Sequence, residues 1–167
     1  SVHGITPSRL AAAAERFRDR IAPLPRPLIA VLLGGTSRAF CFPADLAASF
    51  GKELAKLARD TGGSLLVTPS RRTQPASLQA LSDAIAGVPQ FVWNGDGDNP
   101  YFAFLALADA IIVTEDSTNM VTEATGTGKP VYVQSLKGRS RRLGHLHAMM
   151  RKRGATRPFE GRIESWS

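Results

Sequence analysis

The stretch Glu115–Ala124 holds the side chains whose types and spacing suggest chemistry most directly. Asp, Ser and Thr near its start are helix-capping residues, and a helix that begins here would leave its first backbone N–H groups unpaired. Because such groups bind phosphate, we expect Ser117, Thr118 and Asn119 to face one. Glu123 follows about two turns later, where a carboxylate can accept hydrogen bonds from ribose hydroxyls. The alternative is an ordinary cap followed by an ordinary helical glutamate.

A glycine pair, Gly34-Gly35, followed by Thr36 and Ser37, comes directly after an apolar run. Two glycines let the backbone approach an anion closely, and the N–H groups that follow can donate to phosphate oxygens. A simple turn after a strand is the alternative interpretation. The loop is neither a Walker sequence nor a full G-x-G-x-x-G, which disfavours an ATPase or an NAD-dependent dehydrogenase.

Arg71 and Arg72 lie between Ser70 and Thr73, after a second apolar run. Arginine suits phosphate because its planar guanidinium can donate two hydrogen bonds at once. The alternative is a solvated surface loop, since exposed arginines need no special role. We favour anion binding for this loop because it follows a strand.

Other residues give weaker signals. Asp96 and Asp98 resemble a metal-chelating pair, but their Gly- and Asn-rich surroundings favour a plain turn, so we predict no metal site. His145 and His147 are two positions apart and would point to different faces of a helix, which disfavours a two-histidine site. Cys41 lies among apolar residues and is predicted to be a small core side chain.

Strand-like and helix-like segments alternate along the chain. Five apolar runs predict strands at 28–33, 64–68, 90–93, 110–114 and 130–134. Apolar spacing of three and four residues predicts helices at 9–22 (capped by Ser8), 44–59, 75–86, 101–108, 117–125 and 143–152. Such alternation is typical of an α/β domain with a parallel sheet, in which ligands bind beyond the carboxyl ends of the strands.

The positive charge is concentrated in one segment. The 167 residues include 21 Lys and Arg against 14 Asp and Glu, a formal charge of +7. Eight basic residues and no acidic one lie in Lys137–Arg157, so the remainder holds 13 basic and 14 acidic side chains, a net charge of −1. Such a segment can contact phosphate groups or an anionic membrane surface. It has no interleaved aromatic residues for base stacking, so nucleic-acid binding is disfavoured.

Composition narrows the class of protein further. The length suits a single domain, and a single cysteine excludes an intrachain disulfide and a multi-cysteine metal site. No apolar run approaches the ~20 residues of a membrane span, and the first residues lack the order of a signal peptide. We therefore expect a cytoplasmic protein. The chain opens at Ser1 and not at Met, so we expect it to be a piece of a longer one.

The order of motifs resembles the C-terminal half of GT-B glycosyltransferases and, more narrowly, the ELM1-type mitochondrial fission family, some bacterial members of which are labelled nucleoside-diphosphate-sugar epimerases. The resemblance extends over about 29–140 and is most specific in one block. That block contains Asn99-Pro100-Tyr101, Leu107–Thr114, Ser117, Met120-Val121, Glu123-Ala124, Gly126 and Gly128-Lys129-Pro130-Val131. The epimerase label fits poorly, because the chain lacks a full dinucleotide fingerprint and a Tyr-x-x-x-Lys pair.

The resemblance implies roles for individual residues. Glu123 corresponds to the acidic residue that holds the donor ribose, and the helix start at Ser117, Thr118 and Asn119 faces the diphosphate. The Gly34–Thr36 loop and the arginine loop lie beside the phosphates, and the backbone near Trp93 and Asn94 lies beside the base. In that family a separate N-terminal domain holds the acceptor and usually the catalytic base, so this chain alone is not expected to catalyse transfer.

These observations give one leading hypothesis and two alternatives. The expected fold is a Rossmann-like three-layer α/β sandwich with a parallel sheet of about five to six strands, divided into an N-terminal helix and Pro-rich connector (1–27), a nucleotide-sugar-binding domain (28–157) and a C-terminal tail (158–167). The leading ligand is a nucleoside-diphosphate sugar, without a separate cofactor. The first alternative is a non-enzymatic scaffold that binds a protein partner or membrane surface, and the second is RNA binding, which only the charge supports.

Overall fold

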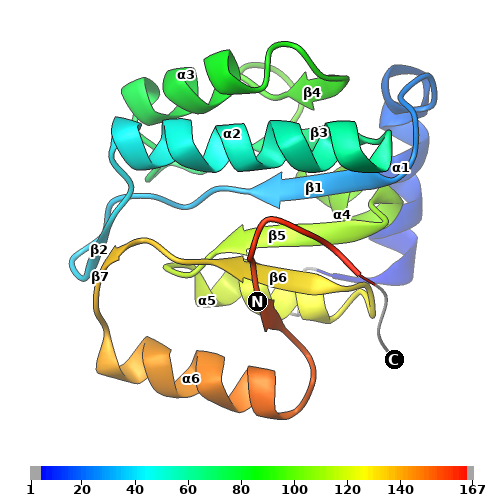
Figure 1. Cartoon of the computed structure of the whole chain (residues 1–167). Coiled ribbons are helices and arrows are strands. Elements are labelled where there is room, and N and C mark those ends of the chain that lie inside the picture. Colours follow the sequence, from blue (N-terminus) through cyan, green and yellow to red (C-terminus); the bar gives the residue numbers. More distant parts are fainter. Residues whose placement is uncertain (1–4, 165–167) are drawn as a thin grey trace.

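A six-stranded parallel sheet forms the middle layer of the computed structural model, which describes residues 5–164 (Figure 1). Its strands are β1 (Leu28–Leu32), β3 (Ser64–Thr68), β4 (Gln90–Val92), β5 (Ala110–Thr114), β6 (Val131–Gln134) and β8 (Arg157–Pro158). They lie in the order β4-β3-β1-β5-β6-β8, and every neighbouring pair is parallel. This is the Rossmann-like α/β class expected from the sequence.

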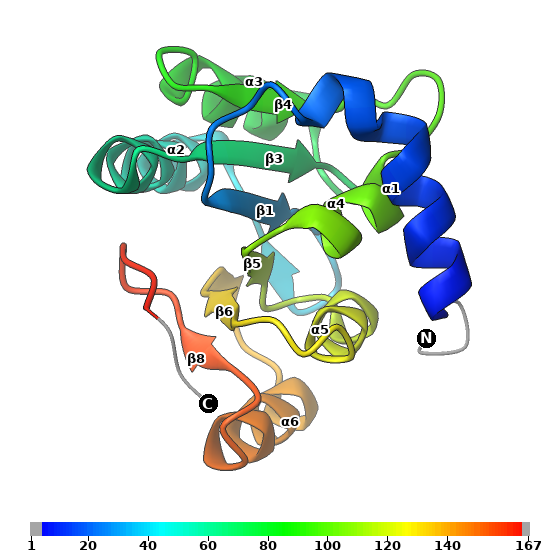
Figure 2. The ribbon, with the colours of Figure 1, turned by 90° about the vertical axis from the view of Figure 1, so that its right-hand side faces the viewer.

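Helices cover both faces of the sheet, as Figure 2 shows. They are α1 (Pro7–Ile21), α2 (Ala44–Thr61), α3 (Pro75–Ala84), α4 (Tyr101–Leu107), α5 (Thr118–Thr125) and α6 (Arg141–Lys152). Alternate residues of β1 enter different cores: Ile29 and Val31 pack with α2 and α3, whereas Ala30 packs with α1, α4 and α5. Burial on both faces explains why the strands are continuous apolar runs.

Most element boundaries agree with the sequence pattern to within one or two residues. The predictions for β3 and β5 coincide with the observed strands. The predicted cap of the first helix is wrong: Thr6, and not Ser8, is the N-cap, and its side chain accepts a hydrogen bond from Arg9 N at 3.1 Å. Pro7 then occupies the first helical position, where its missing N–H has no cost.

Three short strands were not predicted. The strands β2 (Phe40–Cys41) and β7 (Lys137–Gly138) form a separate antiparallel pair, and β8 extends the main sheet beside β6. Each has only two residues, too few for an alternation pattern to be visible in the sequence. The pair β2–β7 joins the loop after β1 to the loop after β6, and so fixes two segments at the carboxyl edge of the sheet.

The segments at both ends of the described chain pack on this core. Phe17 of α1 lies with its ring centroid 6.3 Å from that of Phe91. Phe159, in the stretch assigned to a C-terminal tail, lies 5.9 Å from the ring of Phe50 and 6.5 Å from that of Tyr132. Within residues 5–164, no helix combines the length and apolar character needed to cross a bilayer.

Candidate functional site

The candidate site lies where β1 and β5 end side by side in the middle of the sheet. The chain leaves β1 towards β3 and leaves β5 towards β6, on opposite sides, so this is the topological switch point of the fold. The loop that follows β1 begins with Gly34-Gly35, and the loop that follows β5 contains Asp116. The sequence motifs therefore meet at the edge where α/β proteins bind ligands.

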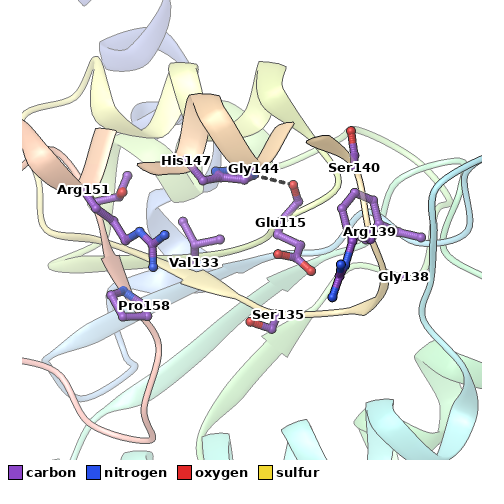
Figure 3. A pocket seen from close by; sticks show the side chains of 12 residues that line it. Glu115, Val133, Ser135, Gly138, Arg139, Ser140, Gly144, His147, Arg151 and Pro158 are labelled. Carbon is purple, nitrogen blue, oxygen red and sulfur yellow. Dashed lines mark hydrogen bonds between the residues drawn. The ribbon is translucent and has the colours of Figure 1, made fainter. Parts of the chain in front are cut away.

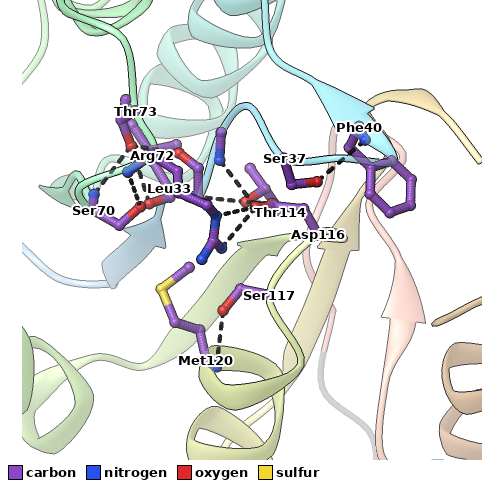
Figure 4. Close-up of polar contacts among 12 residues, drawn as sticks. Leu33, Ser37, Phe40, Ser70, Arg72, Thr73, Thr114, Asp116, Ser117 and Met120 are labelled. Atoms are coloured by element: carbon purple, nitrogen blue, oxygen red, sulfur yellow. Dashed lines mark hydrogen bonds and ion pairs between the residues drawn. The ribbon is translucent and has the colours of Figure 1, made fainter. Parts of the chain in front are cut away.

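Asp116 is the centre of the polar contacts at this edge (Figure 4). Its side chain is fully buried. Thr114 Oγ1 donates a hydrogen bond to Oδ1 at 2.7 Å, and Gly35 N donates to Oδ2 at 3.0 Å. Arg72 adds an ion pair, with Nη2 at 2.8 Å and Nε at 3.3 Å from Oδ2. A buried carboxylate requires such partners, because an unpaired charge in the interior is costly.

The glycine loop is held by the protein itself. Gly34 N donates to Thr114 Oγ1 at 2.8 Å, Thr36 N to the Arg72 carbonyl at 3.1 Å, and Ser37 N to the Phe40 carbonyl at 2.9 Å. A Cβ atom on Gly34 would clash with the Asp116 carboxylate. The glycines are thus needed for close approach, but the donors expected to bind phosphate already have partners. Their assignment as phosphate ligands stays a prediction.

The start of α5 agrees with the sequence pattern, which predicts a capped helix with unpaired N–H groups in its first turn. Ser117 is the N-cap, and its hydroxyl accepts a hydrogen bond from Met120 N at 3.3 Å. The N–H groups of Thr118 and Asn119 have no acceptor within the described chain. Figure 4 shows the Arg72 side chain extending from its loop towards this helix start. Two open N–H groups and a guanidinium therefore share one region at the carboxyl edge.

Glu123 lies on α5 and contacts a residue to which the sequence analysis assigns no role. Tyr101, the first residue of α4, donates its hydroxyl to Glu123 Oε1 at 2.7 Å. Burial raises the pKa of the Tyr101 phenol, and the hydrogen bond and charge of Glu123 raise it further. The phenol therefore remains a neutral donor that orients the carboxylate.

The remaining predicted residues lie around this centre. Arg71 is exposed. Trp93 and Asn94 form a closed turn after β4, in which Trp93 Nε1 donates to the Asp96 carbonyl at 2.8 Å and Asp96 N donates to Asn94 Oδ1 at 2.9 Å. Asp98 forms an ion pair with Arg16 at 3.6 Å. No group of three or more metal-ligating side chains was found among residues 5–164.

Two further predictions about single residues can be compared with the structure. Cys41 is exposed, so its assignment to the core is wrong. The reason is that Cys41, on the short strand β2, lies between Phe40 and Phe42, which are both buried, so its own side chain points the other way. The prediction that His145 and His147 point to different faces is confirmed, because His145 is exposed and His147 is buried.

Sequence reasoning missed three residues that organise the site: Thr114, Asp116 and Tyr101. Asp116 was considered only as a helix cap, because a buried ion pair with a residue 44 positions away has no local signature. Tyr101 was part of the specific Asn99-Pro100-Tyr101 motif, which was a signal for its importance without indicating its partner. All three act by positioning other groups.

Comparison with known proteins identifies a family that matches the whole sequence. The sequence model of the family Mitochondrial fission ELM1 matches residues 1–167. Mitochondrial fission protein ELM1 of Arabidopsis thaliana is 34% identical over 171 residues, which cover 100% of this chain and 40% of that protein. Uncharacterized protein RP120 of Rickettsia prowazekii is 30% identical over 126 residues, 73% of this chain and 35% of that protein. The chain thus spans about two fifths or less of these curated relatives.

Solved structures show the same fold at low sequence identity. UDP-GlcNAc 2-epimerase from Neisseria meningitidis, bound to UDP-GlcNAc, has a TM-score of 0.54 and 15% identity, with 91% of this chain and 40% of that chain covered. MAR1 ribonuclease from Caenorhabditis elegans has a TM-score of 0.50 and 15% identity, with 81% and 78% covered. At this identity the likeness describes the architecture alone.

Proposed function

The chain belongs to the mitochondrial fission ELM1 family, and from this premise we propose that it is a nucleoside-diphosphate-binding domain, with a nucleotide sugar as its ligand. The observation that carries the proposal is the arrangement on α5. Open N–H groups lie at the start of this helix, and a carboxylate oriented by a tyrosine lies further along it. Together they offer one end to a diphosphate and the other to a ribose.

The diphosphate end combines a helix N-terminus with a positioned arginine. The N–H groups of Thr118 and Asn119 and the dipole of α5 favour negative charge. Arg72 uses Nε and one N–H of Nη2 on Asp116, and its side chain is 41% exposed, so other donors of the guanidinium remain accessible. Asp116 cancels the net charge of Arg72, so the attraction comes from directed hydrogen bonds and the helix dipole.

The ribose end depends on Glu123. Its carboxylate can accept hydrogen bonds from two ribose hydroxyls, and the Tyr101 hydroxyl fixes its orientation without protonating it. The closed turn at Trp93 and Asn94 would lie beside the base. The epimerase with a related fold was solved with UDP-GlcNAc, a nucleotide sugar, and this supports the same ligand class here.

Catalysis is proposed to need more than this chain. The described residues include donors for a diphosphate and a carboxylate for a ribose, and we assign none of them the role of catalytic base. Because the relatives are longer, we propose that an N-terminal domain of the GT-B type closes over the carboxyl edge and binds the acceptor. In that arrangement the present chain supplies nucleotide affinity, at the cytoplasmic side of any membrane it contacts.

Isothermal titration against a panel of UDP-, GDP-, ADP- and CMP-sugars tests the proposal. We expect saturable binding to one of them, weakened about tenfold or more by Glu123→Gln. Glu53→Gln, at an exposed position of α2 away from the site, is the matched control and should leave affinity unchanged. Absence of binding to every member of the panel, also by the longer two-domain protein, would contradict the proposal.

A scaffold that binds an anionic membrane surface is the second candidate, and the charge of α6 favours it. The outward side of this helix carries Arg141, Arg142 and Lys152, and Met149 is 45% exposed on the same helix. A basic helix with an exposed apolar side chain suits an anionic lipid surface. Replacing Arg141 and Arg142 by Gln should abolish cosedimentation with anionic vesicles; unchanged cosedimentation would exclude this surface.

A further inference from the structure

A cavity that is separate from the α5 site lies between α6 and the edge strands β6 and β8. It has a volume of about 200 Å³. Figure 3 shows Arg139 and Arg151 at its two ends, with His147 between them and Val133 and Pro158 on the side of the sheet. Glu115 also lines it, so the cavity begins one residue away from Asp116 of the candidate site.

The face that α6 turns to this cavity is unusual for a packed helix. Ser140, Gly144, His147 and Arg151 are spaced four, three and four residues apart and share one side of the helix. A helix that only covers a sheet would place apolar side chains in such a stripe. Here Leu143, adjacent to the stripe, provides the apolar packing, and the stripe itself is polar.

Two buried polar atoms of the cavity wall have no partner among the described residues: His147 Nδ1 and Thr156 Oγ1. The other ring nitrogen, His147 Nε2, lies 2.7 Å from the carbonyl oxygen of Glu115. A carbonyl can only accept, so Nε2 carries the proton, and Nδ1 of the neutral ring is an acceptor. His147 is 8% exposed and Thr156 is 1% exposed. Burying a polar atom without a hydrogen bond costs free energy, and a hydrogen bond to a ligand would offset that cost.

Both arginines of the cavity are available to a ligand. Neither guanidinium makes a hydrogen bond or an ion pair within residues 5–164, whereas Lys137 and Arg157 of the same basic segment are paired with Asp45 and Glu164. Arg139 is held over the cavity mouth by its backbone, because its N–H donates to the Ala39 carbonyl at 3.1 Å next to the β2–β7 pair.

We propose that this cavity binds a small phosphate monoester. Arg139 and Arg151 would bind its oxygens, as guanidinium groups do in phosphate sites. A protonated phosphate oxygen or a ligand hydroxyl would donate to His147 Nδ1, and Thr156 would donate to or accept from a neighbouring oxygen. The volume is below the ~300–1,000 Å³ of pockets for drug-sized ligands, which limits the ligand to a phosphate with a short carbon skeleton.

The acidic side chain of the cavity wall is compatible with this ligand. Among the described residues, Glu115 is the one acidic side chain of the wall, and its Oε1 accepts a hydrogen bond from Leu136 N at 2.9 Å. With two arginines against one carboxylate, the wall retains a positive charge for the phosphate. The same headgroup chemistry occurs in soluble sugar and glycerol phosphates and in phosphatidic acid, so the two sources need separate experiments.

Titration with inorganic phosphate and glycerol 3-phosphate, and flotation with phosphatidylcholine vesicles that contain phosphatidic acid, test the proposal. Vesicles with phosphatidylglycerol, an anionic phosphodiester, are the lipid control. Binding of the soluble probes alone assigns a metabolite, and a preference for phosphatidic acid over phosphatidylglycerol assigns a lipid headgroup. The ring nitrogen signals of His147 should shift in either case and those of exposed His145 should not. If neither class of probe binds, the proposal is wrong.

Matched substitutions separate the cavity from general surface charge. Arg151→Gln should weaken binding about tenfold or more, and Thr156→Val, which keeps the shape of the buried side chain, should also weaken it. Arg153→Gln is the control. It removes a similar exposed charge at the C-cap of α6, and Arg153 does not line the cavity. Equal losses for Arg151→Gln and Arg153→Gln would overturn the proposal, whereas a loss confined to the cavity variants supports it. Arg151 is exposed, so its substitution is expected to leave folding intact.

Discussion

Arg72 Nη2 lies 2.8 Å from Asp116 Oδ2, although the two residues are 44 positions apart in the chain. This ion pair fills the switch point between β1 and β5, the place where many α/β proteins hold the phosphates of a dinucleotide. A ligand at this edge must therefore lie above the pair, towards the start of α5, and Arg72 is oriented for that contact by a carboxylate that solvent does not reach.

Replacing Arg72 should destabilise the fold more than replacing the adjacent Arg71. Arg72→Leu would leave the buried Asp116 carboxylate with only Thr114 and Gly35 N as donors. We expect the free energy of unfolding in urea to fall by about 2–3 kcal/mol. Arg71→Leu, at an exposed position beside it, should change it by less than about 0.5 kcal/mol. Equal effects of the two variants would contradict a structural role for the pair.

The glycine loop should not tolerate a side chain. Gly34→Ala would place a methyl group against the Asp116 carboxylate, and we expect a loss of about 2–3 kcal/mol in thermal or urea unfolding. Gly144→Ala is the control on α6, where a Cβ meets no atom within 4 Å. There the higher helix propensity of Ala should stabilise the protein by about 0.5–1 kcal/mol. A Gly34→Ala variant as stable as the wild-type protein would show that the loop can move away from Asp116.

Alkaline pH should weaken the fold through Tyr101. Its pKa is raised above the ordinary value of 10.0, first by burial and then by Glu123, so the folded protein retains a proton that the unfolded chain loses. The contribution to stability is complete below pH 10 and decreases as pH rises beyond it, by at most about 1.4 kcal/mol per pH unit. In Tyr101→Phe this decrease should be smaller.

The comparison of pH slopes isolates Tyr101 from two other groups that titrate in the same range. Burial raises the pKa of Tyr132 and lowers that of Lys129, and both residues are present in the wild-type protein and in the variant. The free energy of unfolding is measured in urea at several values between about pH 9 and 11. If the free energy of unfolding falls equally with pH in the wild-type protein and in Tyr101→Phe, the alkaline loss of stability does not come from Tyr101.

The thiol of Cys41 should react without unfolding. Its side chain is exposed on β2, so a thiol reagent is expected to modify the native protein completely. Cys41→Ser should show no reaction and should change the free energy of unfolding by less than about 0.5 kcal/mol. A thiol that reacts only after denaturant is added would contradict this exposure and would indicate a core cysteine.

The sequence pattern predicts the layers of this protein well and its long-range contacts poorly. Strands such as β5 are visible because five successive buried residues leave a continuous apolar run. The position of Ser117 as a helix cap is likewise a local property, since its partner lies three residues away. Both depend on neighbours in the chain, which the sequence displays directly.

Contacts between distant loops have no such local pattern. The pairing of Arg72 with Asp116 depends on the strand order, and the polar stripe of α6 becomes visible only when β8 and Thr156 close the cavity beside it. The glycine pair after β1 looks the same whether its N–H groups bind a phosphate or bind Thr114 and Asp116. Only the three-dimensional structure shows that they have partners within the chain.

The position of α6 also gives the molecule an electrical polarity. This helix lies at the β6–β8 edge of the sheet, whereas α3 lies at the opposite edge (Figure 1). Since the excess charge is confined to Lys137–Arg157, the described fold carries a dipole moment directed across the strands. In low salt, the torque on this dipole near any negative surface would turn α6 towards that surface before contact. The molecule would then arrive end-on, with α2 and α3 facing outward and the carboxyl edge of the sheet open at its side.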